Sequence, residues 1–179
     1  MQQDDNDQRG AVVDELRRIE EDVLYSSKGH FNATERWKTL NFALGVPTAV
    51  MSGLAGASAL SQFDHHNVVA GVLALLVAAV TAVITFLNPS EQSVTHKGFG
   101  NRYNALKNRC RVAANVDSRQ VSVDELRQRL DELSAERDQL GADAPGIPRW
   151  AFTKARRGIE QGEAQYKIDQ GESGSGKDG

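Results

Sequence analysis

The sequence predicts an all-α membrane protein, with a transmembrane helical hairpin, an N-terminal amphipathic helix and C-terminal cytoplasmic helices. Residues 39–63 and 68–87 are apolar and carry no charged side chain, and only the polar link 64–67 separates them. An α-helix rises about 1.5 Å per residue, so the roughly 20 residues of the second stretch span about 30 Å, the thickness of a hydrocarbon core. The rest of the chain is strongly charged.

Residues 1–38 form the predicted N-terminal cytoplasmic segment. Within residues 11–25, apolar side chains recur at helical spacing, with acids and arginines on the opposite face: Val12, Leu16, Ile19 and Val23. This pattern predicts an amphipathic helix ahead of the membrane. Its continuation is expected to reach the bilayer with Trp37 at the interface.

The predicted hairpin covers residues 39–90. Its second span is a continuous run of Val, Leu, Ala and Ile, whereas small and polar residues dilute the first span, which is expected to insert together with its partner. Pro47 removes one helix hydrogen bond, so we expect a bend there, either a gate hinge or a fixed bend. The alternative is a soluble protein with two buried core helices, but the remaining chain is too polar to cover two such helices.

The distribution of basic residues predicts the orientation. Lys and Arg residues precede the first span and follow the second, whereas the link 64–67 has neither. Both termini are therefore expected in the cytoplasm. The first 38 residues contain no apolar segment that resembles a cleaved signal peptide. The first span is therefore expected to direct insertion.

The region 91–168 is predicted to be cytoplasmic and helical. Pro89 favours a stop and restart of helix after the second span, followed by a helix over about 92–114. A second helix is predicted from Ser122 to about Leu140, with leucines at seam spacing that pack against the other cytoplasmic helices. A loop is then expected over 141–148, a last helix over 150–169 and a disordered tail over 169–179.

A run of basic residues follows the second span. Residues 97–111 contain five basic side chains and no acid: Lys97, Arg102, Lys107, Arg109 and Arg111. Next to anionic headgroups each charge contributes on the order of 1 kcal/mol of attraction. Ordinary positive-inside anchoring is favoured over specific lipid or nucleotide binding.

Small residues recur every four positions in both spans. They form one ladder in each helix: Gly45, Ala49, Gly53 and Ala57, then Ala70, Ala74, Ala78 and Ala82. Such ladders let helix backbones approach closely in a membrane, where apolar burial gives no net drive. We therefore expect them to form helix contacts within and between subunits.

Six polar residues in or beside the spans are candidates for lining a pore: Asn41, Thr48, Ser52, Thr81, Thr85 and Asn88. On a helical wheel, Asn41, Thr48 and Ser52 fall on one side of the first span, whereas the other three form a stripe near the cytoplasmic end of the second. Polar side chains tend to avoid lipid and to face a bundle interior or a water-filled path. The alternative is that the hydroxyls bond their own backbone or a neighbouring helix.

Several kinds of chemistry find little support. The net charge of −3 argues against nucleic-acid binding, and the four histidines are scattered without neighbours at metal-ligand spacing. Cys110 is the only cysteine and is expected to be a free thiol. Residues 171–177 match the Gly and Lys positions of a phosphate loop, but Asp178 replaces its Ser or Thr and no strand and helix frame it. We assign no catalytic residue, metal or cofactor, and expect no enzyme.

Four blocks together resemble a known family. They are residues 20–37 (EEDVLYSSKGHFNATERW), 86–91 (FLNPSE), 100–111 (GNRYNALKNRCR) and 144–169 (APGIPRWAFTKARRGIEQGEAQYKID). In this order around the hairpin they resemble the SLATT family of bacterial two-span membrane effectors, over roughly residues 14–169. The resemblance implies an effector of prokaryotic conflict systems that forms pores and limits phage spread, usually coupled to a nucleotide-synthesising or nucleotide-sensing partner. It carries over no ligand residues.

The sequence therefore favours an oligomeric pore in the bacterial inner membrane, gated by a nucleotide signal or a sensor partner, whose opening depolarises the membrane and kills or arrests the cell. One hairpin is too small to enclose a channel, so a homo-oligomer is expected. The alternative is a non-conducting membrane-anchored adaptor whose cytoplasmic helices recruit other proteins. A lipid-modifying enzyme is disfavoured because few acids, bases or metal ligands lie near the predicted interface.

Overall fold

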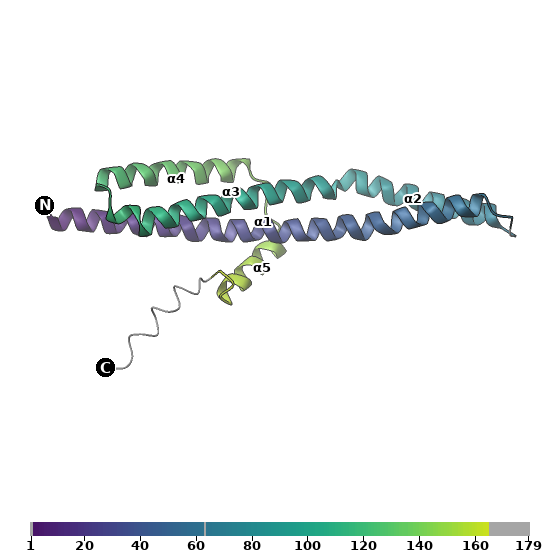
Figure 1. Ribbon diagram of the computed structural model, residues 1–179, viewed down its shortest axis with the longest axis horizontal. Coiled ribbons are helices and arrows are strands. Elements are labelled where there is room, and N and C mark those ends of the chain that lie inside the picture. Colours follow the sequence, from purple (N-terminus) through teal and green to yellow (C-terminus); the bar gives the residue numbers. More distant parts are fainter. Residues whose placement is uncertain (1, 63, 165–179) are drawn as a thin grey trace, which may run out of the picture. The chain divides into compact units, whose positions relative to one another are not determined.

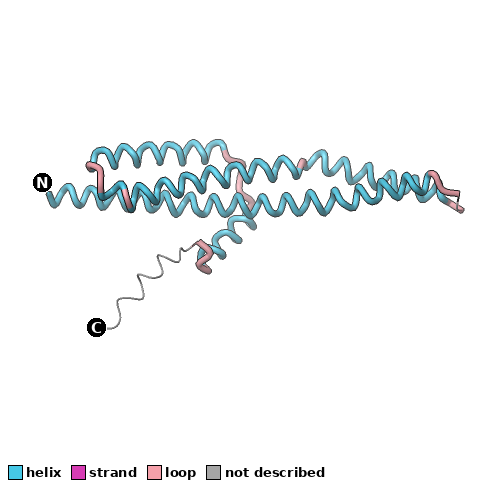
Figure 2. Tube along the Cα trace, viewed as in Figure 1, coloured by secondary structure: helices cyan, strands magenta, loops and turns pink. Residues whose placement is uncertain are grey.

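The computed structural model describes residues 2–62 and 64–164, and the regular elements within these residues are helices, without a strand (Figures 1 and 2). In chain order the elements are α1 (Gln2–Ala59), α2 (His66–Leu87), α3 (Pro89–Asn115), a 3₁₀ turn (Asp117–Arg119), α4 (Val123–Asp143) and α5 (Arg149–Glu160). The all-α prediction is confirmed.

Helix α1 is continuous over 58 residues, so the predicted amphipathic helix and the predicted first span are parts of one helix. Nothing between them stops a helix, because residues 26–38 contain no proline and only one glycine, Gly29. A Cβ placed on Gly29 would lie 2.9 Å from Cγ2 of Ile147, so this glycine gives Ile147 room to approach the helix. The helix also continues through Pro47. A role for Pro47 as a gate hinge stays a prediction.

The chain forms two compact units. The bundle unit contains residues 2–33 and 96–164, and the hairpin unit contains residues 34–62 and 64–95. Apolar side chains are buried in the core of the bundle unit, whereas most of them are exposed in the hairpin unit.

The bundle unit has a hydrophobic core built from three helices. The predicted apolar face of α1 is buried, and α3 and α4 contribute the facing side chains: Val12, Leu16, Ile19 and Val23 from α1, Tyr103, Leu106, Cys110 and Ala113 from α3, and Leu126, Leu133 and Leu140 from α4. Burying one Leu or Val side chain contributes about 1.5–3 kcal/mol. The predicted packing of the α4 leucines against other helices is confirmed, with Leu130 partly buried beside them.

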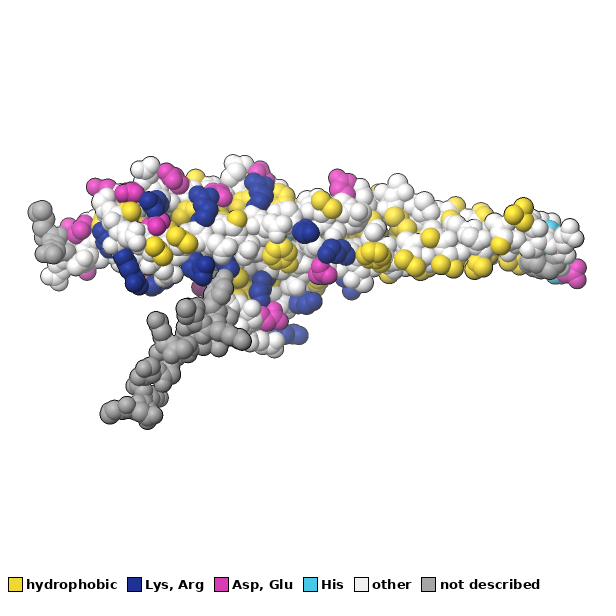
Figure 3. Space-filling model, in the orientation of Figure 1, with side chains coloured by type: hydrophobic (Ala, Val, Ile, Leu, Met, Phe, Trp, Pro, Cys, Tyr) yellow, Lys and Arg dark blue, Asp and Glu magenta, His cyan; other side chains and the backbone are white. Residues whose placement is uncertain are grey.

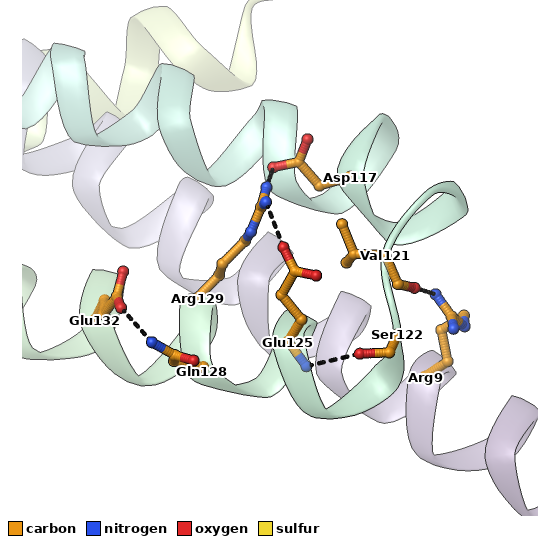
Figure 4. A network of polar contacts seen from close by, with 8 residues as sticks. All are labelled: Arg9, Asp117, Val121, Ser122, Glu125, Gln128, Arg129 and Glu132. Carbon is orange, nitrogen blue, oxygen red and sulfur yellow. Dashed lines mark hydrogen bonds and ion pairs between the residues drawn. The ribbon is translucent and has the colours of Figure 1, made fainter.

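Polar contacts fix the turn between α3 and α4 (Figure 4). The predicted cap is present, since the Ser122 hydroxyl accepts a hydrogen bond from the Glu125 amide at 3.2 Å. Arg129 bonds to both Asp117 and Glu125, and the Arg9 guanidinium donates to the carbonyl of Val121 at 2.9 Å. These contacts tie the first turns of α1 to the same corner.

Two predicted boundaries in the C-terminal region were wrong. Helix α4 extends to Asp143, past the predicted loop start at residue 141, because Leu140 is buried and its carbonyl accepts the Ala144 amide at 3.0 Å. Helix α5 ends at Glu160 rather than 169, because Gly162 adopts a φ of 86°. Such a residue ends a helix, since it turns the backbone into the left-handed region. The predicted tail, with residues 165–169 of the predicted helix, lies outside the described residues.

The break between α2 and α3 is confirmed. Asn88 has a φ of 42°, and its side-chain oxygen accepts the Glu91 amide at 3.4 Å while its own amide donates to the Ile84 carbonyl. Pro89 then occupies the first position of α3, where a missing amide hydrogen costs nothing. The new helix starts three residues before the predicted position at residue 92.

Candidate functional site in the membrane hairpin and in the bundle unit

The apolar segments of the two long helices lie on the outside of the molecule. None of the apolar window in either helix is buried, although both helices are long and apolar enough to cross a membrane. Figure 3 shows hydrophobic side chains, without charged ones, along the paired α1 and α2 segments. The alternative of a soluble protein with two buried core helices was therefore wrong.

Within the hairpin unit, α1 and α2 pack through one narrow seam. Half-buried positions recur at alternating spacings of three and four residues: Asn41, Leu44, Thr48, Met51, Ala55 and Ser58 in α1, with Gly45 as an additional half-buried position, and His66, Ala70, Leu73, Val77, Val80, Ile84 and Leu87 in α2. This spacing is typical of two helices that cross at a shallow angle with interlocked side chains. Positions off the seam point away from the partner helix.

The seam divides the six candidate lining residues. Asn41 and Thr48 are half-buried in it, whereas Ser52, Thr81, Thr85 and Asn88 are exposed. Ser52 thus differs from Thr48, with which the helical wheel grouped it. A pore-lining role for these residues stays a prediction.

Three of the hydroxyl groups bond to their own helix. Thr48 donates to the Leu44 carbonyl at 2.6 Å, Ser52 to the Thr48 carbonyl at 2.9 Å, and Thr85 to the Thr81 carbonyl at 2.9 Å. These bonds agree with the alternative in which the hydroxyl groups bond to the backbone of their own helix. A hydroxyl that donates still has oxygen lone pairs that accept from water or bind a cation.

The small-residue ladders face mostly outward. Gly45 and Ala70 lie in the seam, and the other ladder members are exposed: Ala49, Gly53, Ala57, Ala74, Ala78 and Ala82. A Cβ placed on Gly53 would have no atom within 4 Å. The outward ladder positions therefore do not serve the contact between α1 and α2, and contacts between subunits stay a prediction.

The structure also brings together two histidines that the sequence left apart. His30 of α1 and His96 of α3 are 66 positions apart, yet their Nδ1 atoms lie 2.9 Å from each other in the bundle unit. Both side chains are buried, and the His30 ring stacks on the rings of Phe99 and Tyr103, with centroids 5.8 and 5.5 Å away. One imidazole must donate and the other accept, so two Nδ1–H groups facing each other would break this bond.

Burial sets the titration of this pair. It lowers the pKa of His30 from 6.5 to about 4, with a further contribution from His96. Burial lowers the pKa of His96 as well. The neutral pair is thus the stable form at neutral pH.

A sequence signal for this pair exists. His30 precedes the predicted span start at residue 39 by nine positions, and His96 follows the span end at Leu87 by nine. In an antiparallel hairpin such positions lie at similar heights. The equal offsets, together with Phe99 and Tyr103 one and two turns along α3 from His96, would have indicated the contact.

The five basic residues after the second span do not form one free patch. Lys97 is exposed, the Arg102 guanidinium lies 5.1 Å from the Phe99 ring centroid, and Arg109 pairs with Glu136 of α4. Lys107 and Arg111 are half-buried. Some of this charge therefore serves the bundle unit itself.

Cys110 is fully buried in the bundle core. Burial, with smaller contributions from neighbouring charges, raises the pKa of its thiol to about 11. The thiol is a small apolar core group rather than a reactive one.

Comparison with known proteins identifies one relationship. A family model described as SMODS and SLOG-associating 2TM effector domain family 4 matches residues 12–172. No curated protein and no solved structure matches the chain.

Proposed function

The chain belongs to the SMODS and SLOG-associating 2TM effector domain family, and on that premise we propose that it is an oligomeric pore-forming membrane effector of a bacterial anti-phage system. Several hairpins assemble in the inner membrane, with both termini in the cytoplasm. Opening of the pore depolarises the membrane and kills or arrests the infected cell.

The exposed apolar surface of the hairpin supports a membrane location. Large side chains such as Val50, Leu54 and Leu75 have more than half of their surface exposed, at 57%, 54% and 73%. In water such a surface would drive association, whereas in lipid it is well solvated. A single pair of helices with a packed seam encloses no path for ions, so conduction requires several copies.

The observation that carries the proposal is the position of Ser52, Thr81 and Thr85. They lie in the spans but outside the seam, and are therefore exposed on the hairpin. Hydroxyl groups on the outside of a membrane hairpin gain by facing other subunits or a water-filled path. The outward small residues supply surfaces on which helices of other subunits approach closely.

The test is membrane leakage after induced expression in cells stained with a potential-sensitive dye. The variant Ser52→Leu/Thr85→Leu is expected to reduce depolarisation while its amount in the membrane fraction stays unchanged. The matched control is Val50→Leu/Val83→Leu, which adds bulk at exposed positions of the same two helices without removing a hydroxyl. Full depolarisation by the Ser52/Thr85 variant would remove these residues from the lining.

The gating signal belongs to the same proposal. The signal is a nucleotide, or a protein that synthesises or senses a nucleotide, and it acts on the bundle unit. Helices α1 and α3 connect that unit to the spans, because each of these helices has residues in both units. Co-expression with a candidate partner should make depolarisation depend on that partner. Depolarisation that is equally strong without any partner would contradict gating.

One observation favours the alternative of a non-conducting adaptor. An open groove of about 410 Å³ lies between α3 and α4, and its lining includes Val112, Ala113 and Leu133 together with Arg109 and Arg129. Apolar grooves of this kind accept helices of other proteins. Stable recruitment of a protein without any leakage of the membrane would favour the adaptor over the pore.

A further inference from the structure

A second cavity of about 410 Å³ lies between α1 and α5 in the bundle unit. Side chains from the middle of α1 form one wall, and the C-terminal half of α5 with the turn after it forms the other: Lys28, Phe31, Asn32, Lys154, Ala155, Arg157, Gly158, Gln161 and Glu163. Its volume lies in the range of small-molecule sites. None of these residues belongs to the candidate lining of the pore.

The cavity has an excess of positive charge. Three cations, Lys28, Lys154 and Arg157, face one carboxylate, Glu163. The Lys28 ammonium pairs with that carboxylate at 3.0 Å. Neither Lys154 nor Arg157 takes part in an ion pair with any residue that the structure describes.

The helix end of α5 brings Glu163 back to this site. Gly162 turns the chain with a φ of 86°, its amide donates to the Ile159 carbonyl at 2.9 Å, and the Glu163 amide donates to the Gly158 carbonyl at 3.0 Å. This pair of bonds is the Schellman motif, in which the residue after the glycine folds over the last turn. The carboxylate fills that space, because a Cβ placed on Gly158 would lie 2.3 Å from Glu163 Oε2.

Helix α5, which carries this wall, is held firmly against α1. Ala151, Ala155 and Gly158 are buried, so small side chains form the inner face of α5. The Asn32 side-chain amide donates to the Ala151 carbonyl at 3.1 Å and fixes the first turn of α5 on α1. The packing of α5 on α1 therefore places the cationic side chains of both helices at the same cavity.

We propose that this cavity binds a phosphate-bearing anion, which replaces the Glu163 carboxylate at Lys28 and is also bound by Lys154 and Arg157. The Glu163 side chain is 63% exposed, and an ion pair that is open to water contributes little, so it is readily displaced. A phosphate accepts several charge-assisted hydrogen bonds at once, which a single carboxylate at the cavity edge does not match. A soluble nucleotide and the headgroup of an anionic lipid share this chemistry.

Binding is measured on the full chain in neutral detergent, with the variant Trp37→Phe so that Trp150, the other tryptophan of the chain, reports by fluorescence. One series adds ADP, and the other adds a short-chain phosphatidylserine, with short-chain phosphatidylcholine as the uncharged comparison. Saturable binding of ADP assigns a nucleotide source, and saturable binding of phosphatidylserine but not phosphatidylcholine assigns a headgroup source. Binding of neither ligand, to the parent or to Glu163→Gln, overturns the proposal.

Three variants test the site itself. Arg157→Ala should weaken binding about tenfold, the effect of losing one charge-assisted contact. Arg149→Ala removes the same charge from the same helix but outside the cavity lining, and should leave the affinity almost unchanged. Glu163→Gln removes the competing carboxylate and should tighten binding. Equal weakening by Arg149→Ala and Arg157→Ala would show general charge attraction and overturn the proposed site, and weaker binding to Glu163→Gln would overturn the displacement of this carboxylate.

Discussion

The bundle unit and the hairpin unit are made of similar helices, two of which extend through both, but they place their apolar side chains oppositely. In the bundle unit the apolar faces of α1, α3 and α4 point inward, and Leu16, Leu106 and Leu126 are fully buried. In the hairpin unit only a narrow seam is half-buried, and most Val, Leu and Ala side chains point outward. The difference shows that the two units are built for different solvents, the first for water and the second for lipid.

The largest expected effect distinguishes the two units by their cores. Leu16→Ala should destabilise the protein by roughly 2–5 kcal/mol, because it leaves a cavity in a closed core. The matched change Leu54→Ala, at a side chain that is 54% exposed on the same helix, should change stability far less. Denaturant unfolding of the detergent-purified protein, followed by helix content, measures both. Equal losses would contradict the assignment of different solvents.

A smaller effect concerns the stability of the bundle unit in acid. Unfolded His30 binds a proton near pH 6.5, whereas the folded protein binds it only near pH 4, so stability is present above pH 6.5 and is lost as the pH falls towards 4. The loss attributable to His30 is roughly 3 kcal/mol. His96 acts in the same direction.

The variant His30→Phe removes this titration while keeping an aromatic ring on Phe99 and Tyr103. Its stability should depend less on pH between 6.5 and 4 than that of the parent, as measured by thermal unfolding at a series of pH values. An unchanged dependence would show that other groups carry the acid sensitivity.

The smallest expected effect tests the corner between α3 and α4. Ser122→Ala removes the cap of α4 and should cost about 1 kcal/mol. Ser90→Ala, an exposed serine in the first turn of α3 for which the structure shows no capping bond, serves as control and should be close to neutral. If both changes cost the same in denaturant unfolding, the Ser122 hydroxyl has no capping role.

Local patterns predicted most of the fold. The two spans, the apolar face of α1, the Ser122 cap and the leucines of α4 all follow from residues close together in sequence, where helical periodicity and capping act. The predicted end of the last helix at residue 169 was wrong because Gly162 ends α5 through its positive φ.

The candidate site depended more on contacts between helices. Ser52 lies four residues from Thr48, which places the two side chains only about 40° apart around the helix axis. Because the seam is narrow, this small angle leaves Thr48 half-buried and Ser52 exposed. A wheel for one helix does not show where its partner lies. The His30–His96 pair, and the carboxylate that Glu163 returns to Lys28, likewise depend on which helices pack together, and neither follows from the residues next to them in sequence.

Ion current through a planar bilayer tests the proposed pore itself, because it reports on conduction by the hairpin separately from other cellular processes. The purified chain, supplied with its nucleotide or protein signal, should produce discrete current steps, and Ser52→Leu/Thr85→Leu should reduce their size. A bilayer that stays sealed although the protein is shown by flotation to have inserted into vesicles of the same lipids, with or without its signal, would contradict the account.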